Sequence, residues 1–575
     1  MKLTEGNNHG RIKVRTTAEQ ELAKKIEREK KVVQYKAAIN LIFEKRKNKI
    51  YDDELLFTTE HLVLKIPDIH TIWNIRREAF QNNQWDKEQY VERLKKELSL
   101  TENCLRENPK SYSVWYQRCW VIDHLPSPDW NTELALCAKC LNLDERNFHC
   151  WDYRQHIVKK AGISDEDEFE FSTTKILNNF SNYSSWHYRS KILSKLFPDK
   201  ENKLPIDAEK HKEELDLVMN ATFTDPNDSS AWFYQRWLLD YTETQPNVLW
   251  QVEVTNEAAI VIFHENTCLR PDDLSLSIKV ADQASDDDSN KHHYYITNWN
   301  SLNNSSFSKV WVASLSSEKF DEKDEKPITI SITFKKNTFN LTKSENSNVW
   351  YYRSSSLPLD RHNKTQLKEQ LDNYKQLVQM EPNNKWAILT GIFLMKNYDF
   401  VSYHEDILKD LNLLMKIDHL RANYYADIRS KCVMDYKLHF FQQSKDNSDL
   451  NSTVDLSNLE LTIFYNEHYF TLCQELNLSG NHLNYSLQRL STLRNCQKLS
   501  LSYNNLKSIK NFPTLPNLKY LSLQGNELTN IDEVLNLLSR HKLSVLDIRD
   551  NPVWDSGDIQ SQILNIYPDI ELKVS

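Results

Sequence analysis

A short motif recurs five times in the first part of the chain: a helix-start signal, an aromatic residue, and then the spacing Trp-x-x-Arg. The tryptophans of these copies, taken in order, are Trp73, Trp115, Trp151, Trp186 and Trp232. They lie 42, 36, 35 and 46 residues apart, which is the spacing of stacked helical hairpins. Because a single hairpin cannot bury its apolar face, a chain with this repeat must fold as a continuous array of helix pairs.

The second copy shows the physical logic of the motif. We expect Asn108 to cap a helix whose first position is Pro109, because asparagine accepts bonds from free helical amides and proline has no amide to satisfy. Tyr112, Trp115 and Arg118 follow at three-residue steps, so they lie along one face of that helix.

The later copies vary. In the fifth copy, Asp225 and Pro226 repeat the expected cap and first position, and Phe233 takes the tryptophan's place in the x-x-Arg spacing. A sixth copy, from Glu381 to Trp386, lacks the arginine. Terminal repeats are often atypical in this way, so we expect the last helical repeats in this part of the chain.

Between Trp250 and Phe334 the apolar period changes to two. Val252 and Val254 alternate with polar or charged residues, as do the isoleucines of 328–332. Such alternation is typical of strands with one buried face, and polar segments separate the runs. We therefore predict an inserted antiparallel β-sandwich of about a hundred residues.

The end of the chain carries a second repeat, with the pattern Leu-x-Leu-x-x-Asn-x-Leu. Its asparagines, Asn481, Asn504, Asn526 and Asn551, are 23, 22 and 25 residues apart. An earlier copy that begins at Val454 lacks the asparagine. This pattern predicts leucine-rich repeats, in which we expect each asparagine side chain to bond the loop backbone.

The predicted organisation is mainly α-helical with two added modules. It comprises helical repeats at 1–245, the β-sandwich at 246–348, the last helical repeats at 349–445 and the leucine-rich repeats at 446–575. Residues 350–353 also fit Trp-x-x-Arg, but no capping signal precedes them, so we interpret that match as chance.

Glycine is scarce, with 7 residues in 575 against an average usage of roughly 7%. No placement of these glycines gives a P-loop, a dinucleotide-binding Gly-x-Gly-x-x-Gly or a Gly-x-Ser-x-Gly nucleophile elbow. The absence of these three motifs excludes most classes of nucleotide-binding enzyme. A phosphate, if bound, must be held by side chains or helix ends.

Charge and cysteine content predict a cytoplasmic protein without affinity for nucleic acid. The formal net charge is −9, and the one basic stretch, Arg11 to Lys49, is interleaved with glutamates, so it predicts a solvated helix face. The 9 cysteines are scattered and odd in number, as expected of reduced thiols. We expect neither an N-terminal leader nor a membrane span, because the apolar runs are too short.

Several patterns could bind metal, and each has a plainer interpretation. Cys137-x-x-Cys140 fits half a zinc site or a redox pair, but it lies mid-helix among leucines, which favours core packing. Asp286–Asp288 is similar to a magnesium-binding tract, but its polar surroundings favour a solvated loop. His9 and the pair at 292–293 stand apart from other ligands. We therefore predict no metal site on this chain.

A basic and aromatic set at the helix starts is the stronger candidate. It comprises Lys110, Tyr112, His149, Arg154 and Tyr183. The alternative is core packing, because aromatic residues of helical repeats are mostly buried. However, Lys110 follows the expected cap and proline at a helix N-terminus, where the dipole and free amides favour an anion. A lysine and a phenol at that place can grip a diphosphate.

These motifs resemble the repeats of protein prenyltransferase alpha subunits. The resemblance is carried by Asn-Pro-Lys-Ser-Tyr-x-x-Trp-x-x-Arg at 108–118 and by the corresponding copies at 144–154 and 179–189. It covers about 9–245 and 360–440 and is strongest to the type II, or Rab geranylgeranyltransferase, class. An immunoglobulin-like insert and a leucine-rich tail occur in many type II alpha subunits and are absent from the farnesyltransferase type.

The resemblance implies a right-handed α-α superhelix wrapped around a β subunit, which is an α/α barrel. The β subunit carries the catalytic zinc and most of the isoprenoid pocket. The zinc-bound cysteine thiolate of a Rab GTPase, presented by an escort protein, attacks the first carbon of geranylgeranyl diphosphate. The implied cofactor is therefore zinc held by the partner, and the implied enzyme is the type II protein geranylgeranyltransferase.

Residue roles are implied in the same way. Lys110 contacts the diphosphate and neutralises charge that grows on it as it leaves, and Tyr112 lines the same site. Phe148, His149 and Tyr183 line its diphosphate side. Related alpha subunits can carry tyrosine at the place of Phe148, so a hydroxyl contact is lost or replaced here.

Two other hypotheses stay open. A non-catalytic adaptor of helical and leucine-rich repeats would have no tight β partner and no dependence on Lys110. An alpha subunit of the farnesyl or type I class is disfavoured by the leucine-rich tail.

Overall fold

The computed structural model describes most of the chain as two compact units, Met1–Pro198 with Ile206–Glu214, and Asp199–Pro205 with Leu215–Ser575. The described residues are 18–199, 206–239, 249–270, 272–280, 292–301, 305–315, 328–343, 349–354, 364–443, 453–471, 473–484, 486–553 and 559–573. His9 and Asp286–Asp288 lie outside these ranges, and so do the side chains of His292 and His293.

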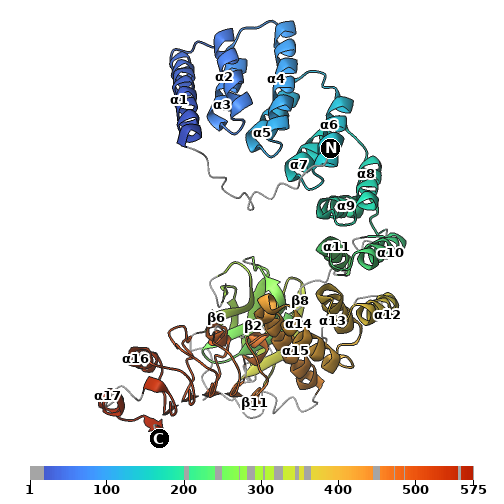
Figure 1. The fold of residues 1–575 in the computed structure, drawn as a ribbon. Coiled ribbons are helices and arrows are strands. Elements are labelled where there is room, and N and C mark those ends of the chain that lie inside the picture. The colour runs from blue at the N-terminus through green and yellow to red at the C-terminus, as the bar shows by residue number, and fades with distance from the viewer. Residues whose placement is uncertain are drawn as a thin grey trace. The chain divides into compact units, whose positions relative to one another are not determined.

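The first unit, here called the helical unit, consists of paired helices (Figure 1). They are α1 (Ala18–Lys47), α2 (Asp53–Lys65), α3 (His70–Asn82), α4 (Lys87–Glu107), α5 (Tyr112–His124), α6 (Trp130–Leu143), α7 (Phe148–Ala161), α8 (Asp165–Asn178), α9 (Tyr183–Leu196) and the first part of α10 (Ala208–Thr224). Helix α2 packs against α3, α4 against α5, α6 against α7 and α8 against α9, and each of these pairs forms a hairpin. The predicted helical array is confirmed, and the charged helix α1 is largely exposed as expected.

The turn before α5 differs from the prediction. Asn108 is the last, capping residue of α4, and Pro109 lies in the turn. The residue that caps α5 is Ser111, whose Oγ accepts from the Val114 amide at 3.4 Å. The Asn108 side chain instead accepts from the Lys110 amide at 3.2 Å, so it stabilises the turn rather than the helix. The assignment of Asn108 as the α5 cap was therefore wrong.

Each repeat tryptophan fastens its helix to the turn before it. The four repeat indoles of the helical unit are buried, and each Nε1–H donates to the carbonyl six residues earlier. These bonds are Trp73 to Pro67 at 2.7 Å, Trp115 to Pro109 at 2.9 Å, Trp151 to Glu145 at 2.9 Å and Trp186 to Phe180 at 2.8 Å. A buried indole needs such a partner, so the turn conformation and the tryptophan specify each other.

The repeat arginine joins three helices. Arg118 of α5 pairs with Glu133 of α6 through two bonds of 2.8 and 2.7 Å. Its Nη1 also donates to the Leu98 carbonyl and the Thr101 hydroxyl of α4, both at 2.9 Å. The same buried two-bond pair occurs as Arg76 with Glu97, Arg154 with Glu168 and Arg189 with Glu214. Each pair thus ties one hairpin to the first helix of the next.

The second unit begins with the rest of α10 and with α11 (Ser229–Leu239). The structure of α11 differs from the prediction for the fifth copy of the motif. Trp232, not Phe233, is buried, and its indole donates to the Pro226 carbonyl at 3.0 Å. The arginine position is therefore held by Gln235, which donates to the Tyr374 hydroxyl. Phe233 is half exposed, so placing it at the tryptophan position was wrong.

The later helices of this unit are α12 (Lys364–Met380), α13 (Lys385–Asp399), α14 (His404–Ile417) and α15 (Ala422–Gln443). Asn384 caps α13 and accepts from the amides of Trp386 and Ala387 at 3.1 and 3.0 Å. The repeat tryptophan lies four residues after its cap, and buried Ile388 occupies that position here. Trp386 is therefore not the repeat tryptophan of the sixth copy.

The inserted module is a β-sandwich of two antiparallel sheets. One sheet has the order β5 (Asn300–Ser301), β6 (Ser308–Ser314), β2 (Ala258–Thr267), β1 (Leu249–Val254), β10 (Trp350–Arg353) and β9 (Thr342–Lys343). The other has β4 (His292–Ile296), β3 (Leu274–Val280), β7 (Ile328–Phe334) and β8 (Asn337–Asn340). Val252 and Phe263 of the first sheet share a core with Leu276 and Ile332 of the second.

Strand β10 lies beyond the predicted end of the insert at 348. It pairs antiparallel with β1, from Gln251 opposite Arg353 to Val254 opposite Trp350. The Trp-x-x-Arg match at 350–353 was correctly set aside as a helical repeat, but the segment is a strand of the insert, so the sheet extends past the predicted boundary.

The last module is a parallel sheet of leucine-rich repeats. Its strands run in order from β11 (Thr453–Asp455) through β12 (Glu475–Asn477), β13 (Lys498–Ser500), β14 (Tyr520–Ser522) and β15 (Val545–Asp547) to β16 (Glu571–Lys573). The short helices η4 (Glu467–Phe470), η5 (Leu487–Thr492), α16 (Ile531–Arg540) and α17 (Ile559–Ile566) belong to the same module. The predicted repeats are confirmed. The strand β16 was not predicted.

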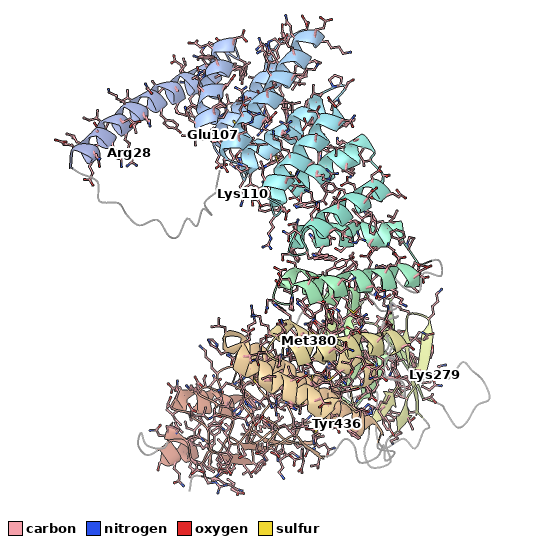
Figure 2. The ribbon with its side chains drawn as sticks, turned by 45° about the vertical axis from the view of Figure 1, so that its right-hand side comes forward. Arg28, Glu107, Lys110, Lys279, Met380 and Tyr436 are labelled. Atoms are coloured by element: carbon pink, nitrogen blue, oxygen red, sulfur yellow. The ribbon has the colours of Figure 1, made fainter. Side chains whose placement is uncertain are left out.

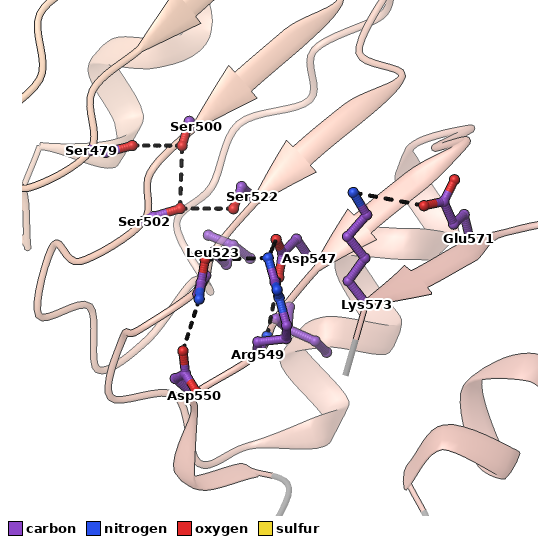
Figure 3. A network of polar contacts seen from close by, with 12 residues as sticks. Ser479, Ser500, Ser502, Ser522, Leu523, Asp547, Arg549, Asp550, Glu571 and Lys573 are labelled. Carbon is purple, nitrogen blue, oxygen red and sulfur yellow. Dashed lines mark hydrogen bonds and ion pairs between the residues drawn. The ribbon is translucent and has the colours of Figure 1, made fainter. Parts of the chain in front are cut away.

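Asparagine and serine side chains connect successive repeats. Buried Asn526 donates to the carbonyls of Leu501 and Leu523 at 3.0 and 2.7 Å and accepts from the amides of Asn504 and Leu506. The other motif asparagines bond the loop backbone in the same way, as predicted. Figure 3 shows a chain of serine hydroxyls across the strands, Ser479 to Ser500 at 2.7 Å, Ser500 to Ser502 at 3.2 Å and Ser502 to Ser522 at 2.7 Å.

We expect Arg118→Ala to destabilise the helical unit by about 3–5 kcal/mol, because it leaves the Glu133 carboxylate buried without its counterion. Amide hydrogen exchange of α4–α7 measures the loss as a lower free energy of opening. Arg106→Ala is the matched control, since its i,i+4 pair with Glu102 is exposed and contributes about 0.3–0.5 kcal/mol. Equal effects of the two substitutions would contradict a structural role of the buried pair.

Candidate functional site

The predicted site residues lie at the starts of the second helices of three successive hairpins. Lys110 lies in the turn between α4 and α5, where Figure 2 labels it, and Tyr112 is the first residue of α5. Phe148 and His149 open α7, and Tyr183 opens α9. The repeat spacing therefore brings side chains separated by about 35 residues of sequence to equivalent places on neighbouring helices.

Three rings at the first two of these helix starts form a cluster. The Tyr112 ring lies 4.2 Å from the His149 ring, edge to face at 90°. It lies 5.9 Å from the Phe148 ring, and the Phe148 and His149 rings are 3.9 Å apart. At the third start, Tyr183 stacks on His187 with 6.0 Å between ring centroids.

The exposure of these rings argues against the core-packing alternative. Tyr112 is 64% exposed, and Phe148 and Tyr183 are each 50% exposed, whereas the repeat tryptophans of the same helices are buried. A row of half-exposed aromatic rings at successive helix starts is typical of a binding surface. His149 differs, since it is buried beneath the rings of its two neighbours.

Lys110 is a cation held by a weak and replaceable partner. Its Nζ lies 3.2 Å from Oδ2 of Asp144, in the turn before α7. The lysine side chain is 65% exposed and the aspartate 36%, so the pair contributes little in water. Asp144 was not predicted as part of the site, although its position in the third copy corresponds to that of Asn108 in the second.

Arg154, included in the predicted set, does not belong to this surface. It is buried, paired with Glu168, and its guanidinium lies 3.5 Å from the centre of the Phe171 ring. The position of Lys110 relative to the helix is also corrected, because Ser111 caps α5 and Lys110 precedes that cap. An anion held by Lys110 would therefore contact the lysine side chain and the turn before α5.

Burial is the main cause that lowers the pKa of His149, and the Lys110 ammonium lowers that pKa further. The carboxylates of Asp152 and Asp68 act in the opposite direction and are weaker than burial. His149 is therefore a neutral imidazole at neutral pH, with one nitrogen able to donate and the other able to accept.

Within the described ranges, no group of three or more histidine, cysteine or acidic side chains is placed to hold a metal ion. Cys137 is fully buried in the core of the helical unit, which confirms the packing interpretation of that residue. All 9 cysteines are free. None of the helices in the described part of the chain has the length and apolar character needed to cross a bilayer.

Comparison with known proteins identifies the repeats. The protein prenyltransferase alpha subunit repeat matches residues 94–125, 130–161, 165–196 and 211–242, and leucine-rich repeats match 494–539. The chain is 33% identical to the geranylgeranyl transferase type-2 subunit alpha of Homo sapiens over 577 residues, which cover 98% of this chain and 99% of that protein. The Rattus norvegicus protein of the same name is 34% identical, with the same coverage.

The chain belongs to the geranylgeranyl transferase type-2 alpha subunit family. In this family member, the first three matched repeats contain the whole candidate site. The Saccharomyces cerevisiae relative is 36% identical over 239 residues, which cover 40% of this chain and 72% of that protein. Among solved structures, Candida albicans protein geranylgeranyltransferase-I complexed with GGPP covers 68% of this chain and is itself covered to 88%, at 17% identity and a TM-score of 0.39.

We expect Lys110→Met to raise the pKa of His149, because the substitution removes a nearby cation and leaves Asp144 without its counterion. Burial remains, so the pKa should stay below its ordinary value. A ring-proton NMR titration of His149 measures the shift. Lys139→Met, at an exposed position of α6, is the control and should leave this titration unchanged.

The lowered pKa of His149 also determines how the stability of the folded chain depends on pH. Between the folded pKa of His149 and about 6.5, the unfolded chain binds more protons than the folded one, so stability rises with pH through that window. If Lys110→Met raises the pKa of His149 in the folded chain, the pH range over which stability rises becomes narrower. A downward shift of the His149 titration in Lys110→Met would contradict the assigned proximity.

Proposed function

We propose that this chain is the alpha subunit of a Rab geranylgeranyltransferase. With a β subunit, it transfers the geranylgeranyl group from geranylgeranyl diphosphate to C-terminal cysteines of Rab GTPases that an escort protein presents. The observation that carries the proposal is the similarity along nearly the whole chain to type-2 alpha subunits. The exposed cation and aromatic rings at three successive helix starts support it.

In the proposed reaction, the thiolate sulfur of the Rab cysteine forms a bond to the first isoprenoid carbon. The bond from that carbon to the diphosphate oxygen breaks, and the electron pair leaves with the diphosphate. Zinc held by the β subunit supplies the thiolate at neutral pH. Negative charge therefore grows on the diphosphate as the bond breaks, and groups that stabilise this charge lower the barrier.

Lys110 and Tyr112 are the residues of this chain suited to that task. The Lys110 ammonium exchanges the Asp144 carboxylate for the more highly charged diphosphate. The Tyr112 hydroxyl, at the exposed end of a ring packed against His149, can donate a hydrogen bond to the same group. His149 holds the Tyr112 ring in place and, as a neutral imidazole, can donate one further bond.

Phe148 and Tyr183 provide apolar and aromatic surface beside these donors. Phe148 cannot donate a hydrogen bond, and its ring packs against those of His149 and Tyr112. The Tyr183 hydroxyl, one hairpin further, is able to supply a donor. The free state of the cysteines agrees with a reducing compartment, and we place the protein in the cytoplasm.

We expect Lys110→Ala to lower prenyl transfer by on the order of 10²–10³, as is typical for the loss of one group that stabilises transition-state charge. The assay uses the alpha chain co-expressed with its β subunit, and supplies Rab, escort protein and geranylgeranyl diphosphate. Assembly of the heterodimer is checked first by gel filtration. Lys139→Ala removes the same charge at an exposed site on α6 and should retain full activity.

The other outcomes separate the hypotheses. Normal transfer by a Lys110→Ala heterodimer would show that the alpha chain serves as a scaffold without a diphosphate contact. Failure of the wild-type chain to form a heterodimer would favour the adaptor of helical and leucine-rich repeats.

A further inference from the structure

The second unit contains a polar cavity of about 670 Å³ where three modules of that unit meet. Strands β2 and β6 of the sandwich, helix α15 and the leucine-rich segments around η4 and η5 contribute to its lining. Figure 1 labels β2, β6 and α15 close to one another in this unit. Pockets of this volume are typical of sites for small ligands.

The lining is rich in hydrogen-bond donors and positively charged. Its charged residues are Lys309 of β6, Lys431 of α15, Arg489 of η5 and a single carboxylate, Glu467 of η4. Most of the remaining lining residues are asparagine, glutamine, serine and threonine. Three cations around one carboxylate make the cavity a region of positive potential in a chain whose formal net charge is −9.

Two of the cations lack a counterion among the residues that the structure describes. Glu467 is engaged by Arg489, whose Nη1 lies 3.2 and 3.3 Å from its two carboxylate oxygens. The guanidinium also lies 5.2 Å from the centre of the Tyr465 ring, so two contacts fix its orientation. Lys309 and Lys431 form no ion pair with any described residue. Their ammonium groups are available to an anion.

His468 lies in the wall of the cavity as a buried, incompletely bonded group. It is 3% exposed, and its Nε2 has no hydrogen-bond partner among the described residues. Burial above all, together with the nearby cations Lys309 and Arg489 and the ring of His264, lowers the pKa of His468 to about 3. A buried polar atom without a partner is destabilising, and such groups in folded proteins are commonly satisfied by a bound ligand or water.

We propose that this cavity binds a compact ligand bearing two or more phosphate groups. Phosphate oxygens match the ammonium groups of Lys309 and Lys431 in charge and the Arg489 fork in geometry. Multiple charges are needed because Glu467 already neutralises one of the three cations. Val310 and Tyr465 are the lining residues with largely apolar side chains, and the three cations favour an anionic ligand.

This site is separate from the proposed diphosphate surface in composition, because it contains none of the residues at the starts of α5, α7 and α9. It gives the sandwich and the leucine-rich module a joint role, since neither module alone supplies more than part of the lining. The same ligand chemistry can come from a soluble polyphosphate or from a phosphorylated lipid headgroup.

The test is calorimetric titration of the full alpha chain, assembled with its β subunit, with inositol hexakisphosphate as the probe. We expect one binding event in wild type and in Lys110→Ala. The double variant Lys309→Ala/Lys431→Ala should weaken it by on the order of tenfold or more, as expected for the loss of two cations. Because both lysines are at least partly exposed, the double variant should fold normally, and its prenyl transfer should match wild type.

The proposal would be overturned by no binding to wild type, or by binding that the double variant leaves unchanged. Loss of binding in Lys110→Ala alone would assign the probe to the transfer site and would also overturn it. Cosedimentation with phosphatidylcholine vesicles containing phosphatidylinositol bisphosphate distinguishes the sources. Capture by wild type but not by the double variant indicates a headgroup, whereas calorimetric binding without capture indicates a soluble polyphosphate.

Discussion

The buried arginine–glutamate pairs set the geometry of the helical unit. Arg118 is fixed by two bonds to Glu133 of the next hairpin and by two more to the first helix of its own hairpin. A guanidinium is suited to this place because its planar fork makes several bonds at once, which the compact ammonium of a lysine cannot do with the same fixed geometry. The same pair occurs at four junctions, so each hairpin is fixed to the next helix by an equivalent contact. The positions of their helix starts, and therefore of the candidate site, follow from these junctions.

Within each motif, the distance of a residue from the helix cap decides whether its side chain is buried or exposed. The tryptophan four residues after the cap bonds the preceding turn and fills the core, while the residue directly after the cap remains at the surface. Tyr112, Phe148 and Tyr183 each lie directly after the cap of their helix. The same periodic pattern therefore produces both a stable helical array and a row of exposed aromatic rings. Lys110 lies in the turn that the Trp115 indole fastens, so packing in the core also positions the exposed cation.

The two repeat patterns and the sandwich could be predicted from the sequence, because their periods follow directly from packing: 35 to 46 residues for the helical hairpins, 22 to 25 for the leucine-rich repeats and 2 for the strands. The helix caps could not. Asn108 and Ser111 are both good capping residues, and only the position of the Trp115 bond decides between them. The Glu133 pairing was missed because the sequence separation between arginine and glutamate varies from pair to pair, at 21, 15, 14 and 25 residues. Trp232 and Phe233 are adjacent aromatics, so the frame of that copy depends on burial, which a sequence pattern does not fix.

The exposure of the site explains why this chain works as a subunit. A lysine that is 65% in water interacts weakly with any anion, because water screens the charge and competes for its hydrogen bonds. The same ammonium becomes a strong stabiliser of developing negative charge once another surface covers it and excludes water. The half-exposed rings of Tyr112, Phe148 and Tyr183 offer the apolar surface on which such a cover can close. In the proposed function, the helical unit presents one side of the catalytic site, and burial by the β subunit would supply the low dielectric that the chemistry needs.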